Sequence, residues 1–215
     1  MATTTHIPSH NRVEPGSINT PATKFPETSS PTPTLNANDI ASDVIHHLNT
    51  ALSQKDYSAV ANLFLEDGFW RDHLCISWDF RTVRGREKIA TFIRDSPLSL
   101  SRVDIDRSTA LRAPHVGPVD AFGDATGIEF FTEVETGMGR GVGVARLIER
   151  EGQWKIFTFF TSLRELKGHE EGLRHRRPKG VEHGERQDSK NWKDKRIADV
   201  DYEEKEPSVV IVGMA

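Results

Sequence analysis

The fold is decided by residues 126–163, which read TGIEFFTEVETGMGRGVGVARLIEREGQWKIFTFFTSL. Three runs within this stretch, 126–136, 140–150 and 153–163, are rich in β-branched and aromatic residues and show two alternating faces. Short connections that contain glycine separate the runs, so each neighbouring pair is expected to form an antiparallel hairpin. The stretch therefore predicts three consecutive strands of one sheet.

Helical spacing dominates the sequence that precedes these strands. A first helix is expected after the capping candidates Asn38 and Asp39, and a second after Asp56 that breaks at 66–68. A third is expected to end before Pro97. The apolar stripes are Ile40, Val44, Ile45, Leu48 and Leu52 in the first helix, Val60, Leu63 and Phe64 in the second, and Ile89, Phe92 and Ile93 in the third.

The order of these elements predicts the fold class. Residues 103–106 alternate like a further short strand, and Pro114, Gly117 and Pro118 predict a loop. Helices first and an antiparallel sheet afterwards indicate an α+β fold. A curved sheet that wraps three helices leaves a cone-shaped cavity, which either holds a small ligand or is filled by aromatic side chains.

Composition excludes several classes of partner and site. The 215 residues carry a formal net charge of −4, which gives no electrostatic reason to expect nucleic acid or an anionic membrane as a partner. The start of the chain does not read as a secretory signal, and no stretch is apolar enough to span a bilayer, so a cytoplasmic protein is expected. Cys75 is the single cysteine, which rules out an intramolecular disulfide and a cysteine-built zinc site.

Uneven composition divides the chain into four expected parts. Pro, Ser and Thr fill 18 of the first 34 positions, so residues 1–35 are expected to be a disordered arm. Residues 36–166 hold the apolar patterns and form the globular body. Charged residues make up 24 of the 43 positions in 164–206, so residues 167–206 are expected to be an extended linker. Residues 207–215 contain the short β-branched run VVIV (209–212).

Three helices followed by a sheet whose final hairpin reads LIEREGQWKI (residues 147–156) resemble the nuclear transport factor 2-like, or SnoaL-like, superfamily. The resemblance covers residues 38–165. It implies a cone-shaped α+β domain, a homodimer through the sheet, and a small hydrophobic ligand in the cone. The superfamily includes isomerases, cyclases, dehydratases and non-catalytic dimerisation modules, so the fold alone does not assign a function.

A second resemblance is to fungal flavin-containing monooxygenase-like proteins. It rests on WRDHL (70–74), SWDFRT (77–82), GVEHG (180–184) and KNWKDKR (190–196), which lead into the terminal run SVVIVG (208–213). In that family a nuclear transport factor 2-like domain precedes an oxidoreductase domain that binds FAD and NADPH. The resemblance implies an accessory domain of such an enzyme, truncated at the start of its FAD/NAD(P)-binding domain.

Only part of the flavin site has a counterpart in this sequence. Gly213 matches the first glycine of the FAD fingerprint, and Ala215 stands where the second glycine is expected. We therefore expect the chain alone to bind neither FAD nor NADPH and to be inactive as a monooxygenase.

Asp72 and His73 are the candidate catalytic residues of an alternative function, a stand-alone SnoaL-like isomerase, cyclase or dehydratase. If residues 70–80 formed one strand, Asp72 would lie among large apolar side chains, in an environment suited to a general base, with His73 on the opposite face. In the structural alternative, which we favour, Asp72 accepts hydrogen bonds from backbone N–H groups or from an arginine such as Arg71 or Arg81.

Other chemical motifs are better explained by structure. His46 and His47 point about 100° apart on a helix, so they do not easily share a metal, and we expect no metal site. The glycine-rich run 137–143 lacks the Lys-Ser/Thr of a phosphate loop and is expected to be a hairpin tip. Cys75 is expected to be a small buried hydrophobic residue. The leading hypothesis is thus an accessory domain, and a third one, a pure homodimerisation module, predicts a filled cone and an exposed apolar sheet face.

Overall fold

The computed structural model describes residues 25–26, 36–120, 123, 125–172, 176 and 192–201. The chain divides into two compact units, Met1–Glu171 and Gly172–Ala215. In the second unit the described part is mainly helix α4 (Trp192–Asp201), whose Arg196 lies over the ring of Trp192. This helix falls within the segment that was predicted to be an extended linker. None of the described helices is long and apolar enough to cross a membrane.

The first unit contains the three expected helices, α1 (Ala37–Ser53), α2 (Tyr57–Asn62) and α3 (Arg86–Arg94). The side chains of Asn36 and Asp56 accept backbone N–H groups at the starts of α1 and α2, as N-caps do. Helix α3 begins after Gly85, whose φ of +88° favours glycine. It ends before Pro97, as expected.

The predicted extent of the second helix was wrong. Helix α2 stops at Asn62, and β1 (Phe64–His73) starts two residues later, so residues 66–68 lie inside a strand. Phe64 packs in the cluster that contains the helices, whereas Leu65 packs in a separate cluster. Successive strand residues point to opposite sides of a sheet, and this is how both apolar neighbours become buried.

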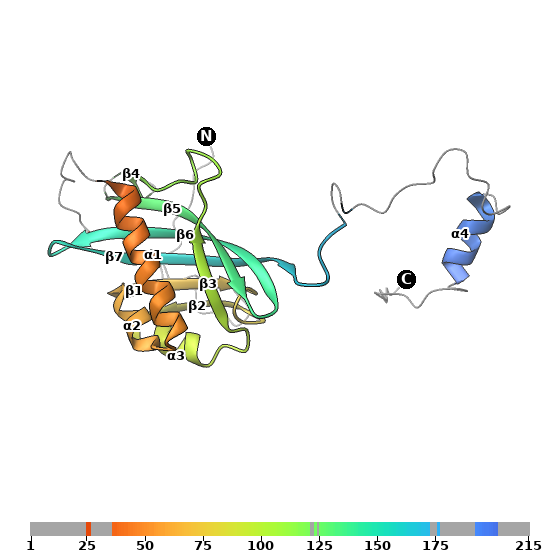
Figure 1. Cartoon of the computed structure of the whole chain (residues 1–215), viewed down its shortest axis with the longest axis horizontal. Helices are drawn as coiled ribbons and strands as arrows, with labels where there is room; N and C mark the ends of the chain where they lie inside the picture. The colour runs from red at the N-terminus through yellow and green to blue at the C-terminus, as the bar shows by residue number, and fades with distance from the viewer. Residues whose placement is uncertain are drawn as a thin grey trace, which may run out of the picture. The chain divides into compact units, whose positions relative to one another are not determined.

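Seven strands form one sheet in the order β2-β1-β7-β6-β5-β3, with β4 paired to β5 (Figure 1). Besides β1, they are β2 (Phe80–Arg84), β3 (Leu100–Ile105), β4 (His115–Pro118), β5 (Thr126–Thr136), β6 (Gly139–Arg150) and β7 (Gln153–Leu166). The three long strands and both hairpins predicted from residues 126–163 are confirmed. Of the glycine-rich run 137–143, only residues 137–138 form the hairpin tip, and the rest begins β6.

Two further expectations about the sheet need correction. The sheet is mixed, because β1 and β7 run parallel while the other pairs are antiparallel. The first and last strands meet side by side, and the rest of the chain supplies the long connection that a parallel pair requires. The loop expected at 114–118 contains β4, a short edge strand in which Pro118 lies at the end, where a missing N–H is tolerated.

The two sides of the sheet differ in what covers them. The side that packs against α1, α2 and α3, here called the inner side, holds the main hydrophobic cluster. Helix α1 crosses this side in Figure 1. The opposite, outer side carries a second and smaller cluster to which none of α1, α2 and α3 contributes. These features are those of an α+β fold.

Candidate functional site

Asp72 lies near the end of β1 and is fully buried. One carboxylate oxygen accepts the backbone N–H and the hydroxyl of Ser77, each at 2.9 Å. The other accepts the hydroxyl of Thr161 at 2.7 Å, and the N–H of Ile76 lies 3.2–3.3 Å from both oxygens. Thr161 in turn accepts the indole N–H of Trp70 at 3.0 Å. The carboxylate is therefore enclosed by donors from the protein itself.

This network holds the turn that follows β1. The continuous strand considered for residues 70–80 does not form, because β1 ends at His73, Leu74 has a φ of +61° and β2 starts only at Phe80. Asp72 accepts the backbone N–H groups of two residues in the turn, so the structure shows it in the role of a structural acceptor. Neither Arg71 nor Arg81 is among the donors that bind its carboxylate.

His73 lies on the outer side of the sheet, away from the Asp72 network. Its Nε2 accepts the Nε–H of Arg71 at 2.9 Å, and its ring makes edge contacts with Phe80 and Phe160. Partial burial, and then the positive charge of Arg71, lower the pKa of His73. The two candidate residues thus belong to opposite sides of the sheet, and the structure does not bring them together as an acid–base pair.

Aromatic side chains pack against one another on the inner side of the sheet. Trp70 is fully buried, and its ring lies 5.7 Å from Phe64, 6.1 Å from Phe92 and 4.8 Å from Phe159 between ring centres. The hydroxyl of Thr132 is buried on the same side and has no hydrogen-bond partner among the described residues. These aromatic side chains belong to the main hydrophobic cluster.

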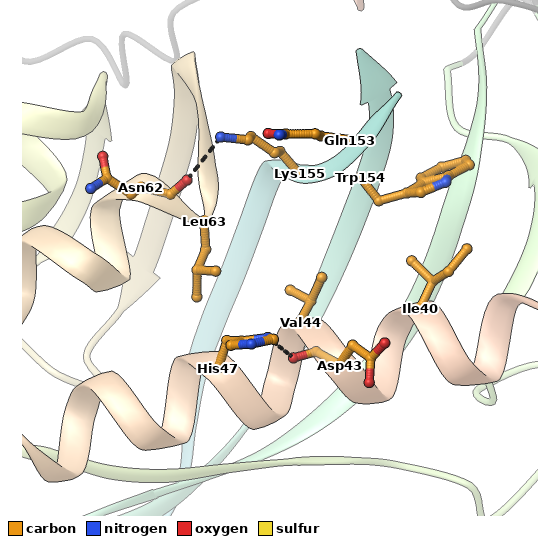
Figure 2. Close-up of a pocket in the computed structure, with 9 residues that line it drawn as sticks. All are labelled: Ile40, Asp43, Val44, His47, Asn62, Leu63, Gln153, Trp154 and Lys155. Atoms are coloured by element: carbon orange, nitrogen blue, oxygen red, sulfur yellow. Dashed lines mark hydrogen bonds between the residues drawn. The ribbon is translucent and has the colours of Figure 1, made fainter. Parts of the chain in front are cut away.

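A groove of about 450 Å³ lies between α1, the end of α2 and the start of β7 (Figure 2). Its apolar lining comes from Ile40, Val44, Leu63 and Trp154, and its polar lining from Asp43, His47, Asn62, Gln153 and Lys155. The imidazole Nδ1 of His47 donates to the backbone oxygen of Asp43 at 2.7 Å, and Lys155 donates to that of Asn62 at 3.3 Å.

The groove was not predicted, although the sequence shows that some of its lining residues share one face of a helix. Ile40, Val44 and His47 are spaced for one helix face, whereas the contribution of β7 depends on tertiary packing. His47 therefore lines a groove rather than pairing with His46 at a metal. Among the residues that the structure describes, no three His, Cys, Asp or Glu side chains are grouped as metal ligands.

The outer side of the sheet carries a band of apolar side chains, here called the outer face: Phe131, Val142, Val144 and Phe160. All four are partly exposed. Cross-strand pairing places Phe131 beside Val144, and Val144 beside Phe160. Arg112 covers part of Phe131, at 5.3 Å from the ring centre. Beyond β1, Phe80 is 66% exposed, so the aromatic surface continues onto β2.

Charges of both signs flank the apolar band of the outer face. Glu129 of β5 pairs with Arg146 of β6 at 2.6 Å. Arg102 pairs with Asp104 on β3 at 2.6 Å, and Arg84 of β2 lies 3.8 Å from Asp67 of β1. These charges therefore have partners within the chain itself.

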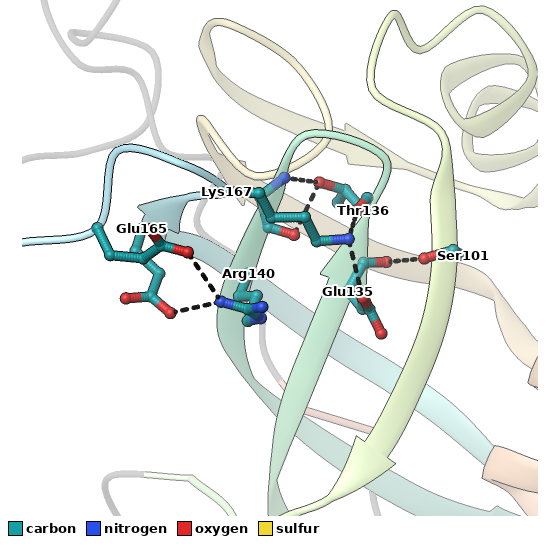
Figure 3. A network of polar contacts seen from close by, with 8 residues as sticks. Ser101, Glu135, Thr136, Arg140, Glu165 and Lys167 are labelled. Carbon is teal, nitrogen blue, oxygen red and sulfur yellow. Dashed lines mark hydrogen bonds and ion pairs between the residues drawn. The ribbon is translucent and has the colours of Figure 1, made fainter.

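A further polar network fixes the end of β7 to the β5–β6 hairpin (Figure 3). Lys167 donates to the backbone oxygen of Thr136 and pairs with Glu135, each at 2.8 Å, while Arg140 pairs with Glu165 and Glu170. Every charged group in this network has an opposite charge beside it. The arrangement is structural, because it holds the last strand in register.

The remaining predicted residues have no catalytic setting. Cys75 is fully buried, as expected, and burial, together with the charge of Asp72, raises the pKa of its thiol to about 12. A thiol of that kind is not a nucleophile at neutral pH. Gly213 and the terminal run 207–215 lie outside the described residues.

No family model matches the chain, and no curated protein matches its sequence. Among solved structures, the chain is similar to a domain with a cystatin-like fold from Nostoc punctiforme, with 14% identity and a TM-score of 0.44 over 61% of this chain and 80% of that one. It is also similar to an NTF2-like protein with a cystatin-like fold from Novosphingobium aromaticivorans, with 14% identity and a TM-score of 0.38 over 59% and 81%. A ketosteroid isomerase-like protein from Erwinia carotovora atroseptica shares 15% identity over 60% and 96%, with a TM-score of 0.42. With TM-scores below 0.5, these similarities assign neither a superfamily nor a reaction.

Proposed function

We propose that the first unit is a non-catalytic accessory module that pairs with a second copy of itself through the outer face. The observation that carries this proposal is the contrast between the two sides of the sheet. On the inner side buried aromatic side chains pack against Trp70, and protein donors surround the carboxylate of Asp72. On the outer side four apolar side chains remain partly exposed in one band.

The apolar band supports a second copy as the occupant of this face, because a two-fold axis brings the band of one chain against the same band of the other. An axis that runs along the strands through the centre of the band would place β5 of one copy over β1 and β2 of the other. The apolar side chains of β6 and β7 would then meet at the axis.

The oligomeric state and one substitution test the proposal. Sedimentation of the full chain is expected to give a dimer mass at micromolar concentration. Val144→Arg, at the centre of the band, is expected to raise the dimer dissociation constant by at least about a hundredfold, because it apposes two positive charges across the axis.

Met138→Lys is the matched control, because Met138 is also an exposed apolar residue but lies at the tip of the β5–β6 hairpin. It is expected to leave the dimer intact. Circular dichroism checks that both variants fold. A wild-type chain that remains monomeric at all concentrations, or equal effects of the two substitutions, would contradict the proposal.

We further propose that this module serves a flavin-containing monooxygenase-like oxidoreductase. The support is the sequence resemblance of residues 70–74, 77–82, 180–184 and 190–196. The reading frame downstream of the codon for Ala215 tests it, and the absence there of a glycine-rich loop, an FAD segment and an NADPH segment would refute it. Tight binding of FAD by the purified chain would contradict the expectation that the chain alone holds no cofactor.

The isomerase alternative has one observation in its favour, the groove beside Trp154, which has the volume of a small-ligand site. Asp72 and His73 are not among the residues that line it. A reaction in the groove would therefore need other groups, such as His47. Screening small apolar carbonyl compounds for His47-dependent turnover tests this alternative.

A further inference from the structure

Six apolar residues form a socket on the outer side of the sheet, next to the outer face. They are Leu65, Phe69, Val119, Ala125, Ile148 and Phe157, and each is at most 7% exposed. The socket residues come from β1, β6, β7 and the segment between β4 and β5. None of α1, α2 and α3 packs on this cluster, so something else must account for its burial.

Phe25 supplies part of that cover. Its ring lies 5.0 Å from the ring of Phe157, edge to face, and Phe157 in turn contacts Phe69 at 5.8 Å. Phe25 is the only aromatic residue among the first 35, and Pro26 follows it directly. Proline disfavours helix at the residue before it, so Phe25 is biased towards the extended backbone that can present its ring to a sheet.

The chain can deliver Phe25 to the socket from its own N-terminal arm. Ten residues, 26–35, connect Phe25 to Asn36 at the start of α1. A fully extended segment of this length reaches up to about 33–36 Å. A composition rich in Pro, Ser and Thr provides no competing hydrophobic core in the arm.

We propose that the socket is a docking site for an extended Phe-Pro segment, which this chain provides in cis through Phe25 and Pro26. The docked segment shields the apolar end of the outer side. Its release uncovers Phe69 and Phe157, which lie on the same side of the sheet as the outer face. The proposal does not rest on the proposed dimer, because the socket and Phe25 belong to one chain.

A peptide supplied in trans tests the site. The probe is a fluorescently labelled peptide of residues 19–31, NTPATKFPETSSP, and the receptor is the full chain with Phe25→Ala. This receptor is expected to bind the peptide measurably by fluorescence anisotropy. The same peptide with Phe25→Ala is expected to bind at least about tenfold more weakly, because it lacks the buried ring.

The wild-type chain is expected to bind the peptide several-fold more weakly than the Phe25→Ala chain, because its own segment competes at an effective concentration of the order of millimolar. Phe80→Ala is the matched control, since it removes an aromatic ring from the outer side without emptying the socket. This control should bind the peptide as weakly as wild type does.

Three results would overturn the proposal: no binding of the peptide to the Phe25→Ala chain, equal binding of the two peptides, or equal binding to the Phe25→Ala and Phe80→Ala chains. Repeating the titrations with Val144→Arg added separates this site from the dimer, because peptide binding is expected to survive in a monomer. Loss of peptide binding in that monomer would show that the segment docks between copies instead of in cis.

Discussion

At the scale of single residues, the role of Asp72 depends on a partner that is distant in sequence. A buried carboxylate in an apolar run can be a general base or a structural acceptor, and the sequence left both open. The structure adds Thr161, 89 positions away, and the turn residues Ile76 and Ser77. The proximity of Asp72 to Thr161 cannot be deduced from residue types. The burial of Cys75 could be, because a lone cysteine is usually a small buried hydrophobic residue.

Asp72→Asn is therefore expected to destabilise the fold by about 1–3 kcal/mol. The amide keeps the shape of the carboxylate but replaces one acceptor oxygen by a donor. That donor then faces N–H or O–H groups that donate to the carboxylate of Asp72 in the native chain. Urea denaturation at neutral pH measures the loss.

Asp67→Asn provides the comparison for this substitution, because Asp67 lies in the same strand, has a side chain that is 42% exposed and pairs only loosely with Arg84 at 3.8 Å. Its effect is expected to stay within about 0.5 kcal/mol. If both substitutions lowered the free energy of unfolding by similarly small amounts, Asp72 would not be a structural anchor, and the catalytic alternative would be favoured.

At the scale of elements, the hairpins could be predicted and the α2–β1 boundary could not. Strands β5, β6 and β7 alternate over ten or more residues and are separated by glycine, so local sequence is sufficient. Phe64 continues the helical spacing of Val60 and Leu63, yet it forms the first residue of β1, where it pairs with Ile156 of β7. A tertiary contact decides that boundary.

The segment between β3 and β4 contains a buried carboxylate, Asp106, whose contribution to stability depends on pH. Asp106 is buried and accepts hydrogen bonds from the N–H of Ser108 at 2.8 Å and the guanidinium of Arg112 at 2.7 Å. Its contacts with Ser108 and then Arg112 lower the pKa of Asp106 to about 2. In the unfolded chain the pKa of an aspartate is about 3.9. Because the pKa of Asp106 is lower in the folded chain, its ionised form stabilises the fold.

The stabilisation by Asp106 is expected to be complete above about pH 4 and to disappear as the pH falls towards about 2. Accordingly, Asp106→Asn should lower the urea midpoint at pH 6, and the difference from wild type should shrink as the pH is lowered through this window. NMR titration of the carboxyl carbon provides the direct measurement, and Arg112→Gln should raise the pKa of Asp106. A difference in midpoint that stays constant with pH would contradict this account.

At the scale of the whole molecule, the class of fold followed from the order of the elements, but the pairing of the sheet did not. Nothing local to β1 indicates that it will lie parallel to β7, because the two strands pair across some 90 residues of sequence. The contact of Phe25 with Phe157 escaped prediction for the same reason, since composition alone marked residues 1–35 as an arm without structure.

The first unit is expected to fold without the second. The residues of both hydrophobic clusters lie between Phe25 and Leu163, and the network around Arg140 and Lys167 is complete by Glu170. A chain ending at Glu171 should therefore show one cooperative thermal transition by circular dichroism.

A chain ending at Leu163 loses the ion pairs made by Glu165, Lys167 and Glu170, together with the last residues that pair β7 with β6. It should unfold several degrees lower, since about 1 kcal/mol shifts the midpoint of a domain of this size by roughly 2–8 °C. Equal midpoints would show that the end of β7 contributes nothing, and a non-cooperative transition in the longer chain would show that the core boundary lies beyond Glu171.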